Sequence, residues 1–454
     1  MHLSREQVAE LVAPHPDTLE RVYSWLKYNG VSPSSISISH GNSWLTVAEV
    51  PMSQANKLLG ASYELYYHAW ANATILRTVS YALPAALHMH VKTVAPTTAF
   101  TSTRLLQKTQ LSHSDGEAAP ANATSGEPSD MLPRGEKSYI MPQFLRWLYS
   151  MPFNNPDPTD RNKLGIAGFA NQFPDTKDLY KFIGRYRSDL DPETASTRIL
   201  TTLSVNGGVD GVEDGTVSGR RANLDTQYSV ALTYPTQIEY YTIGGVQETK
   251  PDGTPMDGDQ YVEWLRYMIS MPNVPLTISV PYFTRELDLP KEYVKSLCNL
   301  FEVLGARGVS ILVASGDEGV GRGLWDRMKY GVPFSASFPA SCACDVYYLI
   351  ARSTHALAPG LGTSCSLNRH HFTGPCVTSV GGTTGFNPEI GSQTSGGGFS
   401  NYFDRPDYQK DAVIPFLVNL GSQHVGLYKC VRSRSLTKPI LTITSAQPSG
   451  SWCP

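Results

Sequence analysis

Two acidic residues stand where their chemistry could serve an active site. Asp317 lies in the glycine-rich turn 315–321, directly after the apolar run 309–314. Burial beside such a run raises the pKa of a carboxyl group, so Asp317 could hold a proton and donate it to a developing oxyanion. It could equally do no more than shape the turn. Asp225 lies in the segment 222–228, which we predict to be helical, and taken alone it could be a solvated surface acid.

Glycine-rich segments follow at 377–385 and 395–400. Consecutive glycines allow a backbone to approach a ligand closely, although each segment alone is a weak signal. The eleven histidines lie outside these segments and outside the segments of both acids. Their positions argue against a hydrolase that uses a Ser-His-Asp triad.

The overall composition excludes several classes of protein. With 454 residues the chain is long enough for two or three domains, at ~100–200 residues each. Its formal net charge of -3 provides no basic field for a nucleic-acid partner. The longest apolar runs are well short of the ~20 residues that cross a membrane, so we expect no membrane span.

From about residue 139 the sequence alternates between short apolar runs and amphipathic segments. This pattern predicts an α/β domain with a parallel sheet that helices cover on both faces. Ligands in such sheets bind at the carboxyl ends of the strands, where the turn of Asp317 falls. We predict strands at 165–169, 199–205, 238–243, 276–280 and 309–314, and helices at 176–186, 222–232, 260–271 and 291–304.

A small α+β unit is predicted to come before this domain. Ser4, followed three residues later by Gln7, is a capping-box pattern that predicts one helix start. Asp17 predicts a second helix start in the same way. Alternating residues predict strands within 36–49 and 93–100.

Taken together and in this order, these segments resemble the sedolisins, the serine-carboxyl peptidases with a subtilisin-like fold that include tripeptidyl peptidases. The resemblance implies that residues 1–107 are an activation propeptide of the pro-kumamolisin type and that residues 138–428 are the peptidase domain. Residues 108–137, rich in Ser, Pro, Gly, Ala and acids, would be an exposed linker where maturation cleavage occurs. The matching segments are 145–149, 222–228, 297–301, 305–310, 315–317, 338–341, 380–383 and 395–400.

The resemblance implies hydrolysis of peptide bonds at acid pH by a Ser nucleophile, a Glu general base, an Asp that orients the Glu and a second Asp at the oxyanion hole. A paired carboxylate suits acid conditions because its pKa is lower than that of His. On this chain Asp225 is then the orienting acid and Asp317 the oxyanion residue. Arg221 stands at the position of the base. Glu213 is then the residue that corresponds to the family's base, displaced from its position by an apparent insertion of residues 214–221. We expect Arg221 to pair with Asp225 across one helical turn and to lower its pKa.

A second apparent insertion, 343–374, contains Ser364 in a Gly-Thr-Ser sequence that imitates the family's nucleophile. We treat Ser364 as a decoy, because the resemblance implies a nucleophile that follows the segment 395–400. Residues 429–454 do not match the family. We therefore expect an incomplete chain that lacks both the nucleophile and the calcium-binding loop, holds no metal and is inactive as it stands.

The resemblance also implies the surroundings of the site. Cys298 would pair with Cys342, although Cys376 is a competitor and seven cysteines leave at least one without a partner in a monomer. The segment 277–285 lacks the Gly of the family's Ser-Tyr-Gly turn, so the substrate preference stays open. The substrate-binding residues would be Ser279, Tyr282, Ser395, Gly396 and Gly397.

The expected partner is a peptide or protein substrate, with the protein's own propeptide as an intramolecular inhibitor and no nucleic acid or membrane. We expect an extracellular monomer, and the sequons at Asn72 and Asn122 permit glycosylation. The first residues contain no apolar signal segment, so either the protein is cytosolic or a secretion signal is missing from this chain. Two other functions stay open: a non-catalytic peptide-binding or inhibitory propeptide-like protein, and an intracellular α/β hydrolase that uses Ser364.

Overall fold

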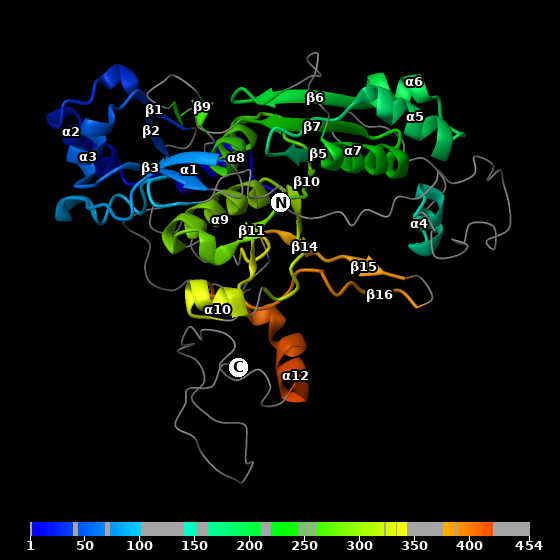
Figure 1. The fold of residues 1–454 in the computed structure, drawn as a ribbon. Helices are drawn as coiled ribbons and strands as arrows, with labels where there is room; N and C mark the ends of the chain where they lie inside the picture. Colours follow the sequence, from blue (N-terminus) through cyan, green and yellow to red (C-terminus); the bar gives the residue numbers. More distant parts are fainter. Residues whose placement is uncertain are drawn as a thin grey trace, which may run out of the picture.

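A parallel six-stranded sheet forms the centre of the computed structural model (Figure 1). The strands lie in the order β14, β12, β10, β5, β7, β6, and neighbouring strands are parallel, as the predicted α/β class requires. They are β5 (Lys163–Gly168), β6 (Leu200–Val205), β7 (Gln237–Ile243), β10 (Thr277–Val280), β12 (Ser310–Ala314) and β14 (Thr378–Val380). The structure describes residues 2–39, 44–68, 73–100, 140–151, 162–209, 219–244, 248–249, 255–256, 260–321, 324–332, 334–342, 376–385 and 388–420.

Helices cover both faces of the sheet, because successive strand residues point to opposite sides. Ile166 and Tyr240 pack with α5 and α7 on one face. Their neighbours Ala167 and Tyr241 pack with α8 and α9 on the other face. The core is therefore divided into two halves, one on each side of the sheet. These four helices are α5 (Thr176–Tyr186), α7 (Arg220–Thr233), α8 (Gln260–Ser270) and α9 (Lys291–Ala306), each within a few residues of its predicted range.

One crossover connection has the opposite hand to the others. The chain passes from β5 through α5 to β6 and then returns through α7 to β7. These two connections run in opposite directions along the sheet, yet their helices α5 and α7 pack on the same face and against each other. The two connections must therefore differ in hand. The connections through α8 and α9 reverse both face and direction, and so share the hand of the α5 connection. Because nearly all crossovers are right-handed, the α7 connection is the left-handed one.

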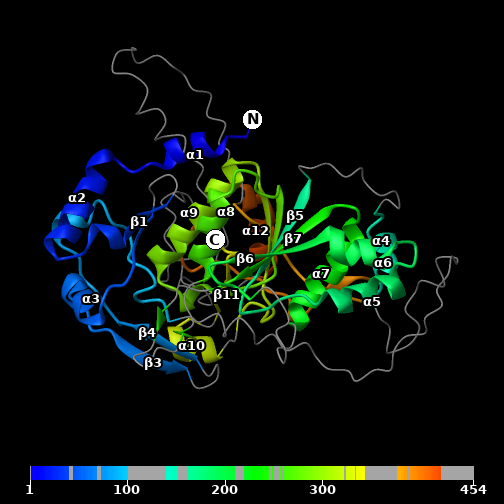
Figure 2. The ribbon, with the colours of Figure 1, turned by 90° about the horizontal axis from the view of Figure 1, so that it is seen from above.

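The N-terminal elements lie beside α8 and α9 at one end of the molecule (Figure 2). Ser4 caps the first helix, and its capping box with Gln7 is present as predicted. The N–H of Leu3 donates to the carbonyl of Ala306 at 3.0 Å, and Val8 is 1% exposed within the core cluster of α8 and α9. The elements are α1 (Arg5–Val12), α2 (Pro16–Tyr28), η1 (Pro33–Ser35), β1 (Ile36–Ile38), β2 (Leu45–Val47), α3 (Met52–Leu59), β3 (Glu64–His68), β4 (Ala73–Arg77) and η2 (Ala85–Leu87).

Two predictions for this N-terminal region are wrong. The second helix begins at Pro16 with His15 as its cap, so Asp17 lies in the first turn instead of at the cap. The segment 93–100 contains no strand. Its Pro96 has no N–H to donate to a ladder. The carbonyl oxygen of the neighbouring Thr97 accepts a hydrogen bond from the N–H of Thr78.

Short elements complete the carboxyl side of the sheet. Strand β11 pairs with β13 in antiparallel fashion, beyond the end of β10. Within the described ranges, the structure contains no helix of the length and apolar character that crossing a bilayer requires. The remaining elements are α4 (Pro142–Leu148), α6 (Pro192–Thr194), η5 (Ala195–Ile199), β8 (Glu248–Thr249), β9 (Pro255–Met256), β11 (Thr284–Arg285), η6 (Glu286–Asp288), α10 (Leu324–Tyr330), β13 (Ser337–Phe338), β15 (Thr383–Thr384), β16 (Ile390–Gly391), η7 (Asp407–Gln409) and α12 (Lys410–Leu420).

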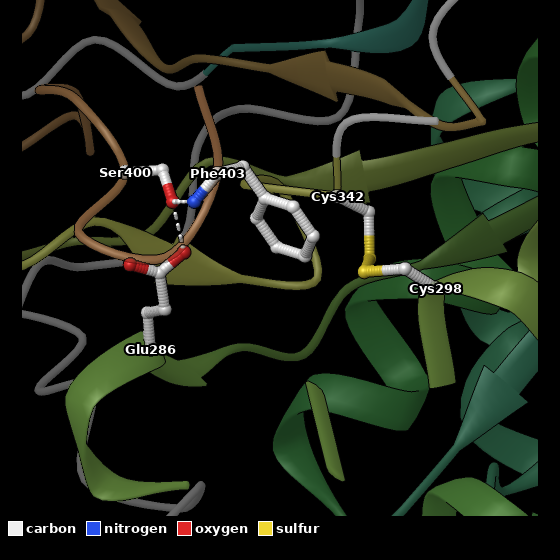
Figure 3. The surroundings of a disulfide bond; sticks show 5 residues. All are labelled: Glu286, Cys298, Cys342, Ser400 and Phe403. Carbon is white, nitrogen blue, oxygen red and sulfur yellow. Dashed lines mark hydrogen bonds between the residues drawn. A yellow bond between two sulfur atoms is a disulfide. The ribbon is translucent and has the colours of Figure 1, made fainter. Parts of the chain in front are cut away.

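A buried disulfide links α9 to the segment that follows β13. The structure pairs Cys298 with Cys342 instead of Cys376. The partly buried ring of Phe403 packs against the same core cluster as the two sulfur-bearing residues (Figure 3). The covalent link therefore fixes the outer end of the β11–β13 pair to the helix layer.

The contact between α1 and the helix layer can be tested at Val8. A Val8→Asp substitution puts a charge into this apolar interface, and we expect it to destabilise the fold by about 2–5 kcal/mol. Thermal unfolding followed by circular dichroism measures the loss. Val79→Asp makes the same chemical change at a residue that is 73% exposed, and it should stay within about 0.5 kcal/mol of the wild type. Equal losses in the two variants would contradict the packing described for α1.

Candidate active site

The strand order changes direction between β5 and β10, which marks the place where such sheets bind ligands. From β5 the chain moves toward β6 and β7, whereas from β10 it moves toward β12 and β14. A crevice outside the carboxyl ends of the strands forms at such a point. The segments that leave these strands are 169–172 after β5, 281–283 after β10 and 315–321 after β12. The turn of Asp317 therefore lies at the predicted edge.

Arg221 attaches the first turn of α7 to the end of β10. Its Nη1 donates a hydrogen bond of 2.8 Å to the carbonyl oxygen of Pro281. Its guanidinium carbon lies 5.5 Å from the centre of the Tyr282 ring, within the range of a cation–π contact. Arg221 is thus part of the helix, as its predicted place at the position of the base requires, and it faces the crevice.

Asp225 follows one helical turn later and is held largely away from water. Its Oδ2 is buried and has no hydrogen-bond partner within the described part of the chain. Burial raises the pKa of Asp225 to about 7, while the positive charge of Arg221 acts in the opposite direction. The predicted net lowering of this pKa is therefore wrong. Arg221 does favour the carboxylate, but the loss of hydration is the larger effect.

Asp317 lies on the same edge of the sheet and is exposed on its turn. Partial loss of hydration raises its pKa, the charge of Arg221 lowers it, and the neighbouring Glu318 raises it. Arg221 therefore acts on both acids, which places Asp225 and Asp317 around one guanidinium group. The pKa shift of Asp317 has the predicted direction, although its side chain is only partly withdrawn from water. An exposed acid can meet a substrate directly.

The glycine-rich segment packs directly against the Asp317 turn. The N–H of Gly396 donates to the carbonyl of Gly316 at 2.6 Å, and the N–H of Gly397 donates to that of Gly319 at 3.0 Å. A Cβ atom on Gly396 would lie 1.9 Å from the carbonyl oxygen of Ser315, so only glycine allows this approach. Ser395 accepts a hydrogen bond from the N–H of Gly382. The three residues predicted from the glycine motif thus lie against the Asp317 turn.

The other two predicted substrate residues lie deeper. Ser279 is inside β10, where it is paired with Leu312 of β12 and Ile166 of β5. Tyr282 is 1% exposed, and its ring packs edge-to-face against Phe169 with centroids 5.2 Å apart. The Tyr282 side chain therefore supports Arg221 from within the core and is not on the surface of the crevice, which corrects its predicted role.

Two residues that the sequence analysis did not single out hold the Asp317 turn and the glycine-rich segment in place. Arg285 donates from Nε and Nη2 to Oε2 of Glu318, at 2.8 and 2.6 Å. Glu286, its neighbour, is fully buried and accepts hydrogen bonds from Ser400 and Asn401. The available signal in the sequence was this pair of adjacent charged residues, Arg285 and Glu286, in the mostly apolar stretch after β10.

Several predicted residues fall outside the described ranges. These are Glu213, the proposed base, Ser364, the decoy, and the tail 429–454. Within the described part of the chain, no group of three or more His, Cys, Asp or Glu side chains could hold a metal ion.

Comparisons with known proteins show what the chain is similar to. Residues 1–100 match the family model described as "Pro-kumamolisin, activation domain". Tripeptidyl-peptidase SED2 of Arthroderma otae is 29% identical over 445 residues, which are 94% of this chain and 65% of that protein. Probable tripeptidyl-peptidase SED3 of Trichophyton verrucosum is 31% identical over 441 residues, again 94% and 65%. Over nearly its whole length, the chain is therefore similar to tripeptidyl peptidases.

This chain spans slightly less than two thirds of the length of the relatives that it matches. A solved Pseudomonas sedolisin, described as a serine-carboxyl proteinase complexed with pseudo-iodotyrostatin, is 19% identical to it. The TM-score of that pair is 0.33, over 55% of this chain and 61% of the sedolisin.

Asp225 gives the stability of the fold a specific pH dependence. Its pKa is about 7 in the folded protein and ~3.9 in an unfolded chain, so folding is penalised once the pH is high enough to ionise it. The penalty is complete above pH 7, shrinks as the pH falls and is absent below about pH 4. An Asp225→Asn variant should therefore have a higher Tm than the wild type at pH 8 and nearly the same Tm at pH 4.

Differential scanning fluorimetry across this pH range measures the difference. The control is Asp191→Asn, at an exposed helix cap. Since the capping hydrogen bonds lower the pKa of Asp191, its loss should cost more stability at pH 8 than at pH 3. A difference of the same sign for both variants would contradict the raised pKa of Asp225.

Proposed function

We propose that this chain is a secreted, acid-acting peptidase of the serine-carboxyl type that releases tripeptides from the N-termini of peptides. The observation that carries the proposal is the pair of acids, Asp225 and Asp317, arranged around Arg221 at the carboxyl edge of the sheet. No histidine occurs between His113 and His355 in the sequence, so the elements that bear the acids carry none. The relatives named as tripeptidyl-peptidases support the substrate class.

Each acid has a distinct part in the proposed mechanism. Asp317 is exposed, and its raised pKa keeps it protonated over more of the acid range, so it can donate to the oxygen that becomes negative when the peptide carbonyl is attacked. Asp225 orients the general base, for which Glu213 is the proposed residue. In acid, a carboxylate base stays available where an imidazole would be protonated. The serine nucleophile is not assigned to any described residue.

The remaining expectations belong to the same proposal. Residues 1–107 would inhibit the peptidase region intramolecularly, with cleavage in the linker 108–137 during maturation, and the protein would act as an extracellular monomer. Calcium stays a prediction from the family resemblance, since the described residues offer no cluster of ligands for it, and no step of the mechanism passes through it.

A second function, peptide binding without cleavage, is favoured by one observation. Arg221 places a positive charge at the position where the family has its base. A guanidinium cannot accept a proton from an attacking hydroxyl, but it can form paired hydrogen bonds with a carboxylate. If Glu213 does not reach Asp225, the crevice would hold a peptide without cutting it.

An assay with one peptide separates the two functions. If the chain acts as a peptidase, the purified protein should release tripeptides at pH ~3–5 from a peptide with a free N-terminus and not from its acetylated form, as followed by mass spectrometry. A chain that lacks the nucleophile, as expected from the sequence, should release none. Asp317→Ala should lower the rate by about 100- to 1000-fold, as the loss of one oxyanion donor does. Peptide binding measured by fluorescence anisotropy, with no product from the wild type, would instead establish the second function.

The identity of residue 221 gives a further test. Arg221→Glu places a carboxylate one helical turn before Asp225, and it should increase the rate of tripeptide release at least ~10-fold if a base is what this position lacks. Arg198→Glu, at an exposed position of η5, is the control and should leave the rate unchanged. If Arg221→Glu has no effect on the rate while the protein stays folded, Arg221 does not occupy the position of the base.

A further inference from the structure

Two neighbouring residues, Arg285 at the end of β11 and Glu286 at the start of η6, bond to two different segments at the carboxyl edge of the sheet. The N–H of Glu286 donates to the carbonyl of Ala336, just before β13, at 2.9 Å. The pairing of β11 with β13, Thr284 with Phe338 and Arg285 with Ser337, fixes the backbone from which they project. The disulfide after β13 fixes the same pair of strands to α9.

Arg285 holds the turn that contains the oxyanion residue. Its guanidinium makes two hydrogen bonds to Glu318, the residue next to Asp317. Asp288 and Asp326 lie 4.0 and 3.9 Å from the same group. The pair with Glu318 is 12% and 26% exposed, so it is screened by water less than a surface pair would be. This contact determines where the 315–321 turn lies relative to β10.

Glu286 holds the end of the glycine-rich segment (Figure 3). One carboxylate oxygen accepts from the hydroxyl of Ser400, and the other accepts from the N–H of Asn401 at 2.6 Å. The Ser400 oxygen in turn accepts from the N–H groups of Tyr402 and Phe403, at 3.0 and 2.9 Å. A fully buried carboxylate is costly unless donors surround it. The donors to Glu286 include Ser400 and Asn401, which follow Gly398, and the side chain of Ser341, which follows β13, also favours the carboxylate form.

The two segments are also joined to each other, which closes a ring of contacts. The glycine segment donates through Gly396 and Gly397 to Gly316 and Gly319, on either side of Asp317 and Glu318. The ring runs from Arg285 to Glu318, across to the glycine segment, and back through Ser400 to Glu286. Two adjacent residues, Arg285 at the end of β11 and Glu286 at the start of η6, therefore fix the turn and the glycine-rich segment against each other.

We propose that Arg285 and Glu286 are positioning residues that together hold the Asp317 turn against the glycine-rich segment, and so determine the shape of the surface that a peptide meets beside Asp317. The proposal rests on the proposed function for its substrate, a peptide chain. Neither residue acts on the substrate itself. Glu286 acts through Ser400 and Asn401, and Arg285 acts through Glu318.

Hydrogen–deuterium exchange of the full chain tests the positioning directly. Glu286→Gln replaces one carboxylate oxygen, which accepts a hydrogen bond, with an NH2 group that would face another donor. Amide exchange in the proteolytic fragments that cover 395–403 should therefore be about 10-fold faster or more. Ser400→Ala should have the same effect, and Ser400→Thr, which keeps the hydroxyl, should restore slow exchange. The double variant Glu286→Gln/Ser400→Ala should exchange no faster than either single variant, because both remove one interaction.

Glu239 provides the matched control for this experiment. It is also a buried glutamate, 9% exposed, and it bonds to Lys163 and Tyr241 near the opposite edge of the sheet. Glu239→Gln should leave exchange in 395–403 unchanged. Arg285→Lys, which keeps the charge but loses the two-pronged contact, should speed exchange in 315–321. The proposal would be overturned if exchange at 315–321 and 395–403 stayed unchanged. It would also be overturned if every variant sped exchange equally at these segments and at the distant helix α5.

A binding measurement connects the positioning to the substrate. With a fluorescent peptide that has a free N-terminus, Glu286→Gln should raise the Kd about 10-fold, whereas Ser400→Thr and Glu239→Gln should not. A normal Kd in Glu286→Gln, together with fast exchange at 395–403, would overturn the link to the peptide. If the wild type binds no peptide, the proposed function fails, and the exchange data still decide whether the two residues position the two segments.

Discussion

The burial of the Asp225 carboxyl group is the constraint around which the site is organised. Placing an ionisable group beside an apolar sheet costs free energy once it is charged, and the chain reduces this cost with a guanidinium one helical turn away instead of a direct partner for Oδ2. The result is an acid that titrates near neutrality. Burial raises the pKa of Glu286 in the same way, and partial burial raises that of Asp317. All three shifts favour the protonated forms, so these groups make the fold more tolerant of acid than of base.

The reversed connection through α7 brings that acid to the correct place. Helix α7 follows β6 in the sequence, and β6 lies two strands away from β5, yet the first turn of α7 bonds to Pro281 at the end of β10. It reaches that point because it lies on the same face as α5 and returns toward the centre of the sheet. Asp317 arrives independently, from the turn after β12. Two acids that are about ninety residues apart in the sequence thus meet at one edge because of sheet topology.

The sequence predicted the regular elements of the sheet domain closely, because apolar periodicity there is dictated by burial on both faces. Helix 176–186 has the predicted ends, and β7, α8 and α9 differ by one or two residues. The errors arose where a single contact decides the outcome: His15 caps α2, and Pro96 prevents a strand. The site residues Asp225 and Asp317 were found, but the direction of the Asp225 pKa was not, since it depends on how much water a carboxyl group loses. Arg285 ends a two-residue strand whose partner, β13, is about fifty residues away, Glu286 follows it directly, and no local pattern reveals that pairing.

The way in which the N-terminal region is attached has a consequence for its removal. Leu3 and Arg5 bond to the carbonyls of Ala306 and Ser270, at the carboxyl ends of α9 and α8, and these helix ends lie at the edge of the sheet opposite Asp317. Cutting the chain between the two regions would leave these contacts of α1 intact. The severed molecule would remain a two-chain complex, and the time for which it persists would be governed by the dissociation rate of α1 from the helix layer, not by the speed of the cut.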